Sequence, residues 1–351
     1  MSSLVDSFLA ERIRRTPDPE LTGEWPSERL ASLREFGVFR WGLPVEFGGL
    51  PATRSQLLEG YIELSRLCLT TAFILTQRDA ACHRIAASPN LELRQNLLPE
   101  HCSGRAMTTV GISHLSTSRQ HWSRPSVQAH RTPHGFELTG EAPWVTGARY
   151  ANLLVTGASI ENGEQILLAI PTTQPGITVR EPLKLLALNS SCTGSVMLDR
   201  VAVRFEDVIV GPVPQVMKIG ATGGTGSLTT TAVAVGTTSR TLESLRGEAA
   251  NRPDLVAVAN RLSGQHAVLL ADLLAAAEDS PDSSDLRLAA ESLRHRANSL
   301  AARAAQTLVC CAKGAGFVSG HPAERSLREA MFFQVWSCPP YVTNATLNDL
   351  G

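Results

Sequence analysis

The chain has 351 residues, of which 43% are hydrophobic and 19% are charged, a composition typical of a globular protein. Its formal net charge of −1 gives no basic excess, so a nucleic-acid partner is not expected. No uninterrupted apolar run approaches the ~18 residues of a membrane-spanning helix, and the first residues do not form a basic stretch followed by an apolar one, so neither a membrane span nor an export signal is predicted.

The number and spacing of the cysteines and histidines predict neither disulfides nor a metal site. Seven cysteines without a Cys-x-x-Cys spacing favour free thiols in a reducing compartment, and we predict a cytoplasmic protein. The nine histidines show no metal-binding spacing, so no metal site is predicted.

The first block, residues 1–103, is predicted to be helical. Apolar residues recur at spacings of three and four within 4–9, 30–36 and 57–67, and further helices are expected over 70–86 and 91–102. A loop rich in glycine and proline, residues 42–50, separates the second of these helices from the third.

The second block, residues 104–212, changes to short β-rich runs separated by turn signals such as His134-Gly135 and Asn162-Gly163. This pattern predicts an antiparallel sandwich or barrel. The expected strands are Met107–Ile112, Val127–His130, Phe136–Thr139, Leu153–Gly157, Ile166–Ile170, Ile177–Val179, Val196–Leu198 and Val201–Phe205.

The third block, residues 213–351, returns to a helical period. A long apolar stripe rich in alanine runs from Leu286 to Cys311 and ends near Gly314. Alanine lets neighbouring helices approach closely, so this block is predicted to be an antiparallel helical bundle.

A tryptophan and a threonine two residues apart, Trp144 and Thr146, lie in an otherwise small and apolar run, residues 140–148. In an extended segment both side chains would point to one face, where an indole plane and a hydroxyl suit a flat heterocycle. The alternative is a strand end with a half-buried tryptophan.

Six segments follow one another in the order found in a known family of flavoproteins. Through them the chain resembles the acyl-CoA dehydrogenase superfamily over nearly its whole length. The segments are residues 36–50, 92–99 with 103–104, 135–148, 175–179 with 185–193, and 205–211, and the last consists of Gly314-Ala-Gly-Phe317 with Glu324-Arg-Ser-Leu-Arg-Glu329.

The resemblance implies an α+β multidomain fold: an N-terminal helical domain (1–103), an antiparallel β-barrel domain (104–212) that faces the flavin, and a C-terminal four-helix bundle (213–351). It also implies an FAD cofactor, a homodimer or homotetramer, and a small-molecule substrate of the acyl-thioester class. The residues that it assigns to cofactor binding are Trp144, Thr146, Ile112, Ser113, Ser118, Arg119 and Gly314.

The catalytic positions depart from the family pattern. Acyl-CoA dehydrogenation needs a base, and Ser337 stands where the resemblance leads one to expect glutamate. The other position that the family uses, on the first bundle helix, falls in residues 227–236, which contain no acid. Cys338 is a candidate base or nucleophile, with a half-buried free thiol as the alternative. His114 is a candidate acid or base, with a plain polar loop residue as the alternative.

Several family contacts to the FAD diphosphate also lack a match, and Arg119 is a candidate replacement. Three function classes remain open: an acyl-CoA dehydrogenase with a displaced base, a flavin monooxygenase or oxidase that needs no protein carboxylate, and a non-catalytic member. Glu329 is expected to pair with an arginine and to take no part in chemistry.

Overall fold

The computed structural model describes residues 4–116, 125–219, 227–278 and 284–350. The longer helices of the first block lie close to their predicted positions. The helices of this block are α1 (Ser7–Arg15), α2 (Pro19–Thr22), α3 (Ser27–Glu35), α4 (Arg54–Leu67), α5 (Leu69–Ala86) and α6 (Leu91–Cys102), with the short 3-10 helices η1 (Val38–Arg40) and η2 (Val45–Phe47) in the loop before α4. The short α2, η1 and η2 were not predicted. Helix α4 begins at a capping box, in which Thr53 and Gln56 each satisfy a backbone N–H of the other.

The β domain forms one eight-stranded sheet with the order β6-β7-β3-β2-β4-β5-β8 and β1 paired to β4. Its strands are β1 (Thr108–Gly111), β2 (Val127–Thr132), β3 (Gly135–Val145), β4 (Leu153–Ser159), β5 (Gln165–Pro171), β6 (Ile177–Val179), β7 (Gly194–Arg204) and β8 (Val208–Val213). The strands expected at 196–198 and 201–205 are one continuous strand, and β8 was not predicted.

The sheet is mixed, whereas the sequence predicts antiparallel pairing alone. Strand β1 runs parallel to β4, with Thr108 opposite Leu153, and β2 meets β4 in a parallel pair at one position. The other pairs are antiparallel. The parallel pair becomes possible because β2 and β3 lie between β1 and β4 in the chain and supply the long crossover that parallel strands require.

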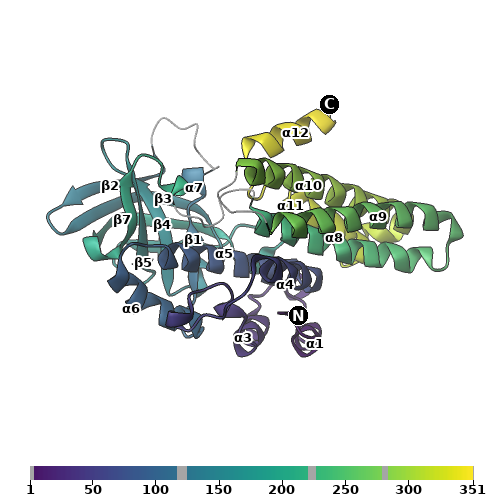
Figure 1. Cartoon of the computed structure of the whole chain (residues 1–351), viewed down its shortest axis with the longest axis horizontal. Coiled ribbons are helices and arrows are strands. Elements are labelled where there is room, and N and C mark those ends of the chain that lie inside the picture. The colour runs from purple at the N-terminus through teal and green to yellow at the C-terminus, as the bar shows by residue number, and fades with distance from the viewer. Residues whose placement is uncertain (1–3, 117–124, 220–226, 279–283, 351) are drawn as a thin grey trace.

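The last block is the helical bundle. It consists of α8 (Leu228–Ala249), α9 (Pro253–Ala276), α10 (Ser284–Ala312), the 3-10 helix η7 (Lys313–Phe317) and α11 (Pro322–Phe332), and α12 (Pro340–Leu350) follows. Figure 1 shows this bundle at one end of the molecule and the β domain at the other, with α5 running between them. Among the described helices, none is both long and apolar enough to cross a membrane.

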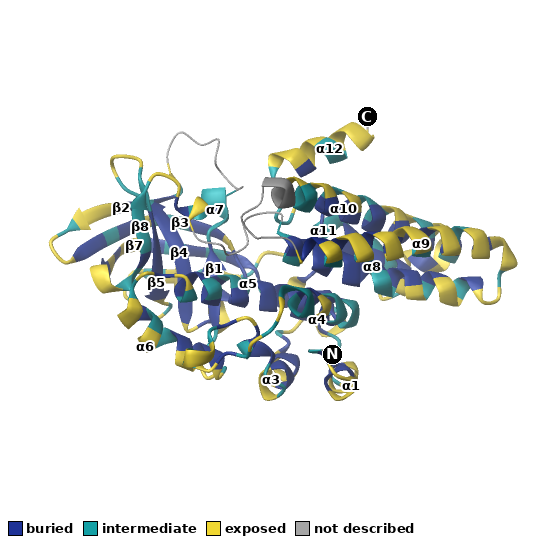
Figure 2. Cartoon of the chain, in the orientation of Figure 1, coloured by how far each residue is buried: buried dark blue, intermediate teal, exposed yellow. Residues whose placement is uncertain are grey.

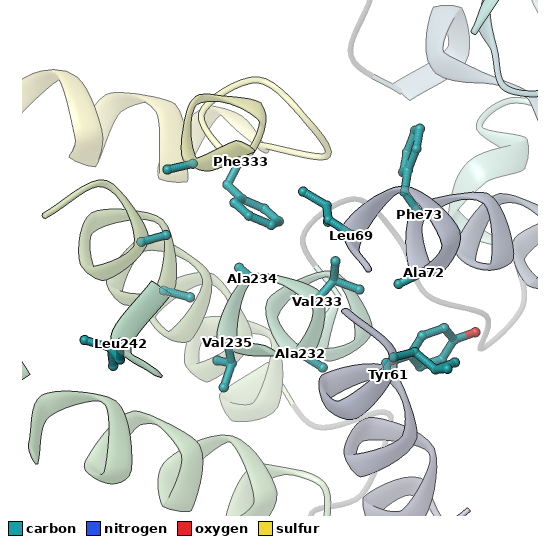
Figure 3. Close-up of a cluster of buried hydrophobic side chains, with 14 of the residues drawn as sticks. Tyr61, Leu69, Ala72, Phe73, Ala232, Val233, Ala234, Val235, Leu242 and Phe333 are labelled. Atoms are coloured by element: carbon teal, nitrogen blue, oxygen red, sulfur yellow. The ribbon is translucent and has the colours of Figure 1, made fainter. Parts of the chain in front are cut away.

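Helix α8 is the centre of the helical core. Its first ten residues are almost all buried, because α4, α9, α10 and α11 all pack against it. Figure 3 shows Val233 of α8 facing Leu69 and Ala72 of α5, with Ala232 on the side of Tyr61 of α4. At Gly236 an added Cβ would lie 2.0 Å from the Ile62 carbonyl oxygen, so only glycine permits this approach of α8 to α4. In Figure 2 buried residues gather along α8 and inside the sheet, and a further buried cluster joins α5 and α6 to the outside of the sheet.

Candidate functional site

Trp144 lies on an irregular part of β3. The register of β3 against β7 shifts between Ala142 and Val145, and Trp144 has a φ of 58°, in the left-handed region. A side chain with a Cβ costs about 1–2 kcal/mol in that conformation. The indole is 50% exposed, whereas its neighbours on both sides are buried. The bulge therefore turns a large aromatic ring out of the sheet into an accessible position.

Thr146 does not share an extended face with Trp144, and that part of the prediction is wrong. Because Trp144 leaves the extended conformation, the strand alternation breaks, and Thr146 is only 2% exposed. Its backbone carbonyl accepts a hydrogen bond of 2.6 Å from the Thr109 hydroxyl on β1. The role of the two residues toward a cofactor stays a prediction.

Three buried hydroxyls form a chain that ends at Thr146. The Thr146 and Thr193 oxygens are 2.9 Å apart, and Thr193 lies 2.8 Å from the Ser191 oxygen at the end of the 3-10 helix η4 (Asn189–Ser191). The three groups carry three protons and make two bonds with one another. One proton, that of the hydroxyl that does not donate within the chain, therefore remains for another acceptor. Thr193 and Ser191 were not among the predicted site residues, although both belong to a polar run, residues 189–193.

The turn after Thr146 is held in place by the N-terminal segment. Trp25 stacks on Tyr150 of the 3-10 helix η3 (Ala148–Tyr150), with ring centroids 4.4 Å apart and planes 9° apart. Gly147 has a φ of 63°, and an added Cβ there would lie 2.5 Å from the Trp25 ring. Glycine at 147 thus allows the indole of Trp25 to cover the turn.

The loop after β1 contacts β3 directly. Ser113 begins the short helix α7 (Ser113–Ser116), and its hydroxyl donates to the Pro143 carbonyl at 3.0 Å, next to Trp144. Ile112 is half-buried between β1 and α7 and packs against the apolar residues behind the sheet. His114 is buried, and its Nε2 donates to the Gly157 carbonyl of β4 at 2.9 Å. This bond supports the structural alternative for His114.

The position expected to hold a carboxylate base lies in a tight turn after α11. Ser337 has a φ of 53°, and the following Cys338 thiol lies 3.1 Å from the Phe333 carbonyl and 3.5 Å from the Trp336 carbonyl. The Asn298 side chain of α10 donates to the same sulfur at 3.5 Å. Cys338 is half-buried, as its structural alternative expects, and its chemistry is taken up below.

A buried arginine, Arg294 of α10, joins the two positions that the family uses for a base. It donates to the Thr230 carbonyl in the first turn of α8 and, at 2.7 Å, to the Trp336 carbonyl beside Ser337. Its side chain is 0% exposed, and burial lowers the pKa of its guanidinium. No carboxylate is among its contacts in the described part of the chain. Both positions therefore border a positive charge.

Aromatic rings pack around Trp336, next to Arg294. Phe73 of α5 meets Phe332 and Trp336 edge-to-face, with centroids 4.9 and 5.3 Å away, and Phe332 stacks on Trp336 at 5.0 Å. The Arg294 guanidinium lies 5.5 Å from the centre of a Trp336 ring. Such contacts with ring faces stabilise a buried cation only in part.

Of the remaining predicted cofactor residues, Gly314 alone belongs to the part of the chain that the structure describes. Gly314 lies on η7 in the helical bundle, where nothing lies within 4 Å of an added Cβ. Ser118 and Arg119 lie outside the described residues.

The expected pairing of Glu329 is confirmed. Glu329 is fully buried between Arg240 and Arg325, and the Arg325 Nε lies 2.8 Å from its carboxylate. These arginines line a cavity of about 480 Å³ that also contains Asp18 and Arg328. Its acids and bases are mixed, so the cavity has no strong preference for an anion.

Comparison with known proteins gives consistent relatives. The family model for the N-terminal domain of acyl-CoA dehydrogenases matches residues 1–105. Over 339 residues the chain is 24% identical to a probable acyl-CoA dehydrogenase, YngJ of Bacillus subtilis (strain 168), covering 90% of this chain and 87% of the relative.

The solved structures share the whole fold. Glutaryl-coenzyme A dehydrogenase in its glutaryl-CoA complex superposes with a TM-score of 0.85 at 17% identity, covering 100% of this chain and 96% of that one. Dibenzothiophene monooxygenase TdsC from Paenibacillus sp. A11-2 gives 0.82 at 18% identity, covering 97% and 93%. With its helical, β and helical blocks in the same order, this chain belongs to the acyl-CoA dehydrogenase superfamily.

Proposed function

We propose that this chain is an FAD-dependent oxidoreductase of the acyl-CoA dehydrogenase type that works without a carboxylate base at either position the family uses. The observation that carries the proposal is the pair formed by the exposed Trp144 indole and the hydroxyl chain ending at Thr146. Both lie at one end of β3, where the sequence resembles the family's flavin-facing segment.

The residues at this end of β3 fit a flavin ring. An accessible indole offers a flat apolar surface for stacking, and the surplus proton of the hydroxyl chain offers a hydrogen bond to a ring heteroatom. Ser113 fixes the position of the strand through the Pro143 carbonyl. When bound, the flavin would supply hydride transfer.

Proton removal is the step that this site handles differently. A serine hydroxyl is a much weaker base than a carboxylate near pH 7, so Ser337 does not replace glutamate in removing a carbon-bound proton. Arg294 donates to the Trp336 carbonyl and so stabilises negative charge near Ser337. An acidic residue in the place of Arg294 would instead repel such a charge. Within the proposal, the candidate base for dehydrogenation of an acyl thioester is the Cys338 sulfur, which follows Ser337 directly in the turn after α11.

A flavin monooxygenase or oxidase is the second candidate. The observation that favours it is the buried Arg294, because an arginine in place of a carboxylate borders both positions that the family uses for a base. Such reactions proceed between reduced flavin and O₂ and require no protein carboxylate. The similarity to TdsC, whose structures include one with FMN and indole, also makes FMN an alternative cofactor.

We also propose that the protein is a homodimer or homotetramer. The resemblance to the family implies a flavin near a boundary between copies, where Gly314 of one copy and Trp144 of another would meet it. The exposed apolar residues beside Gly314, Phe317 at 80% and Val318 at 61%, suit such a boundary. Light scattering of the purified protein should give twice or four times the 37.6 kDa monomer mass.

The absorption spectrum of the purified protein tests the cofactor. A band near ~450 nm is expected, and chromatography of the acid-released compound should identify it as FAD and not FMN. A colourless protein that takes up neither flavin would refute both enzymatic candidates and leave the non-catalytic class.

The reaction is tested next under anaerobic conditions. Bleaching of the flavin band by a member of an acyl-CoA panel supports the dehydrogenase. No bleaching by any thioester, together with O₂ consumption that depends on NAD(P)H or a reductase, supports the monooxygenase or oxidase.

Trp144→Ala tests the assignment of the site itself. It should weaken flavin binding at least tenfold, because loss of an aromatic stacking contact of about 1.5 kcal/mol corresponds to that factor. Phe205→Ala is the matched control. Phe205 is a half-exposed aromatic residue of the same domain, and it packs on Phe136 at the opposite end of β3 from Trp144. Equal effects of the two substitutions would refute the assignment.

A further inference from the structure

Glu20 of α2 is a buried acid at which three parts of the chain meet. Its side chain is 4% exposed. One carboxylate oxygen accepts the Leu188 backbone N–H at 3.1 Å and the Thr70 hydroxyl of α5 at 2.7 Å. The other oxygen accepts a hydrogen bond of 3.4 Å from the Arg328 guanidinium on α11. The N-terminal helices, the β domain and the helical bundle are therefore connected through one side chain.

The loop that Glu20 contacts has an unfavourable backbone conformation. Leu188 and Cys192, which flank the 3-10 helix η4, have φ values of 62° and 48°, in the left-handed region. Residues with a Cβ keep this conformation only where their surroundings impose it. Leu188 is 1% exposed, so its N–H needs an acceptor inside the protein, and Glu20 supplies it.

Two further contacts attach the same loop to the same two helices. The Ser190 hydroxyl donates to the carbonyl of Pro19, the residue before Glu20, at 2.5 Å. Arg328 donates to the Leu186 carbonyl at 3.2 Å. The loop is thus held by α2 on one side and by α11 on the other. Glu20 takes part in both attachments, because it contacts the loop directly and also contacts Arg328.

The other end of this loop reaches the candidate flavin site. Ser191 and Thr193 belong to the hydroxyl chain that ends at Thr146. In addition, the Cys192 carbonyl accepts the Gly147 N–H at 3.3 Å, so the backbone next to Thr146 also depends on the loop. A displacement of η4 would therefore reach the Thr146 hydroxyl through two connections.

The pairing of Glu20 with Arg328 would by itself make Glu20 a structural residue. Arg328 has a second acidic partner, Glu324 of α11, which accepts hydrogen bonds from two of its nitrogens. In the part of the chain that the structure describes, Glu324 makes no hydrogen bond to residues 186–193. The contact with Arg328 is therefore common to both acids, whereas the bond to Leu188 belongs to Glu20.

We propose that Glu20 is a positioning residue of the flavin site. It holds η4 in its left-handed-flanked conformation through the Leu188 N–H, and η4 in turn fixes the place of the Thr146 hydroxyl. This role rests on the proposed flavin site at Trp144 and Thr146. Glu20 acts on that site through the loop and without touching the flavin.

Hydrogen exchange of the apo-protein, followed by mass spectrometry, tests the first step. Glu20→Ala and Glu324→Ala are the matched pair, because both remove an acid from Arg328 and Glu20→Ala alone removes the acceptor of the Leu188 N–H. Exchange in the peptide 185–193 should become about tenfold faster in Glu20→Ala and should stay within about twofold of wild type in Glu324→Ala.

Fluorescence titration with FAD tests the second step. Glu20→Ala should weaken flavin binding about fivefold, because the hydroxyl that donates to the flavin is displaced. In a protein that already carries Thr146→Val, the same substitution should weaken binding less than about twofold, since the bond that Glu20 positions is gone. A role in global stability alone would not produce this dependence on Thr146.

Glu20→Gln is the conservative variant, and it keeps the proposal testable if Glu20→Ala does not fold. The glutamine side-chain oxygen still accepts the Leu188 N–H, while the negative charge beside Arg328 is lost. Loop exchange and flavin affinity should therefore both stay within about twofold of wild type. Circular dichroism checks the fold of each variant.

Three results would overturn the proposal. One is equal loop exchange in Glu20→Ala and Glu324→Ala, another is an undiminished effect of Glu20→Ala in the Thr146→Val protein, and the third is a Glu20→Gln protein with a fivefold loss of flavin affinity. A wild-type protein that takes up no flavin would instead refute the proposed function. The exchange comparison would then still decide whether Glu20 holds η4.

Discussion

Removing single hydroxyls from the chain that ends at Thr146 should separate cofactor binding from stability. Thr146→Val and Thr193→Val each replace a hydroxyl by a methyl of similar size, so packing changes little. Thr146 makes one bond in the chain and Thr193 makes two. At about 1 kcal/mol for each buried hydrogen bond, the losses are about 1 and 2 kcal/mol. These correspond to falls in melting temperature of about 3 and 6 °C.

Flavin affinity should respond in the opposite order. If Thr146 donates the surplus proton to the flavin, Thr146→Val removes that bond and weakens binding about fivefold to tenfold. Thr193→Val leaves the Thr146 proton in place, so binding should change less than twofold. Thermal melts of the apo-protein and fluorescence titration with FAD measure the two quantities, with Thr193→Ser as the control that keeps both bonds. Equal flavin affinities in the two valine variants would refute this arrangement.

Further predictions concern packing and charge. Gly236→Ala should lower the free energy of unfolding by about 3 kcal/mol, because the added methyl overpacks against the Ile62 carbonyl. In Gly247→Ala, on the same helix, the added methyl meets nothing within 4 Å, so this substitution should stabilise the protein slightly. Thermal melts of both variants separate the effect of packing from that of helix propensity. Glu329→Gln leaves two arginines beside a neutral buried group and should cost about 3 kcal/mol, measured by urea unfolding. Burial lowers the pKa of His101 to about 4, so its contribution to stability is complete above about pH 6.5 and is lost as the pH falls toward 4. A His101→Phe variant that keeps the full wild-type decline over this range would contradict that assignment.

The sequence predicted the regular elements well, because their signals are local. The stripe of alanine and leucine located α10, and the boundaries of α6 were predicted to the residue. Strand β8 was missed because its residues, Val208–Val213, contain both glycine and proline, which are typical of loops. The parallel pairing of β1 with β4 was also missed, because pairing partners 45 residues apart leave no mark in a single strand's alternation.

The site was predicted only in part. The resemblance located Trp144 and Thr146, but the alternation rule failed because Trp144 adopts a left-handed conformation that no pattern indicated. Arg294 was missed because one arginine next to an alanine stripe is usually solvated. Its burial depends on hydrogen bonds to the backbone carbonyls of Thr230 and Trp336, which are distant in sequence. Patterns of side chains carry no signal for such backbone acceptors.

The stacking of Trp25 on Tyr150 has a consequence for synthesis of the chain. The ribosome makes Trp25 early, and more than a hundred residues follow before Gly147 and Tyr150 exist to receive its ring. At bacterial or eukaryotic elongation rates this interval is on the order of ten seconds. For that time the indole is an apolar surface without its final neighbours, so the N-terminal segment reaches its final packing only after η3 has been synthesised.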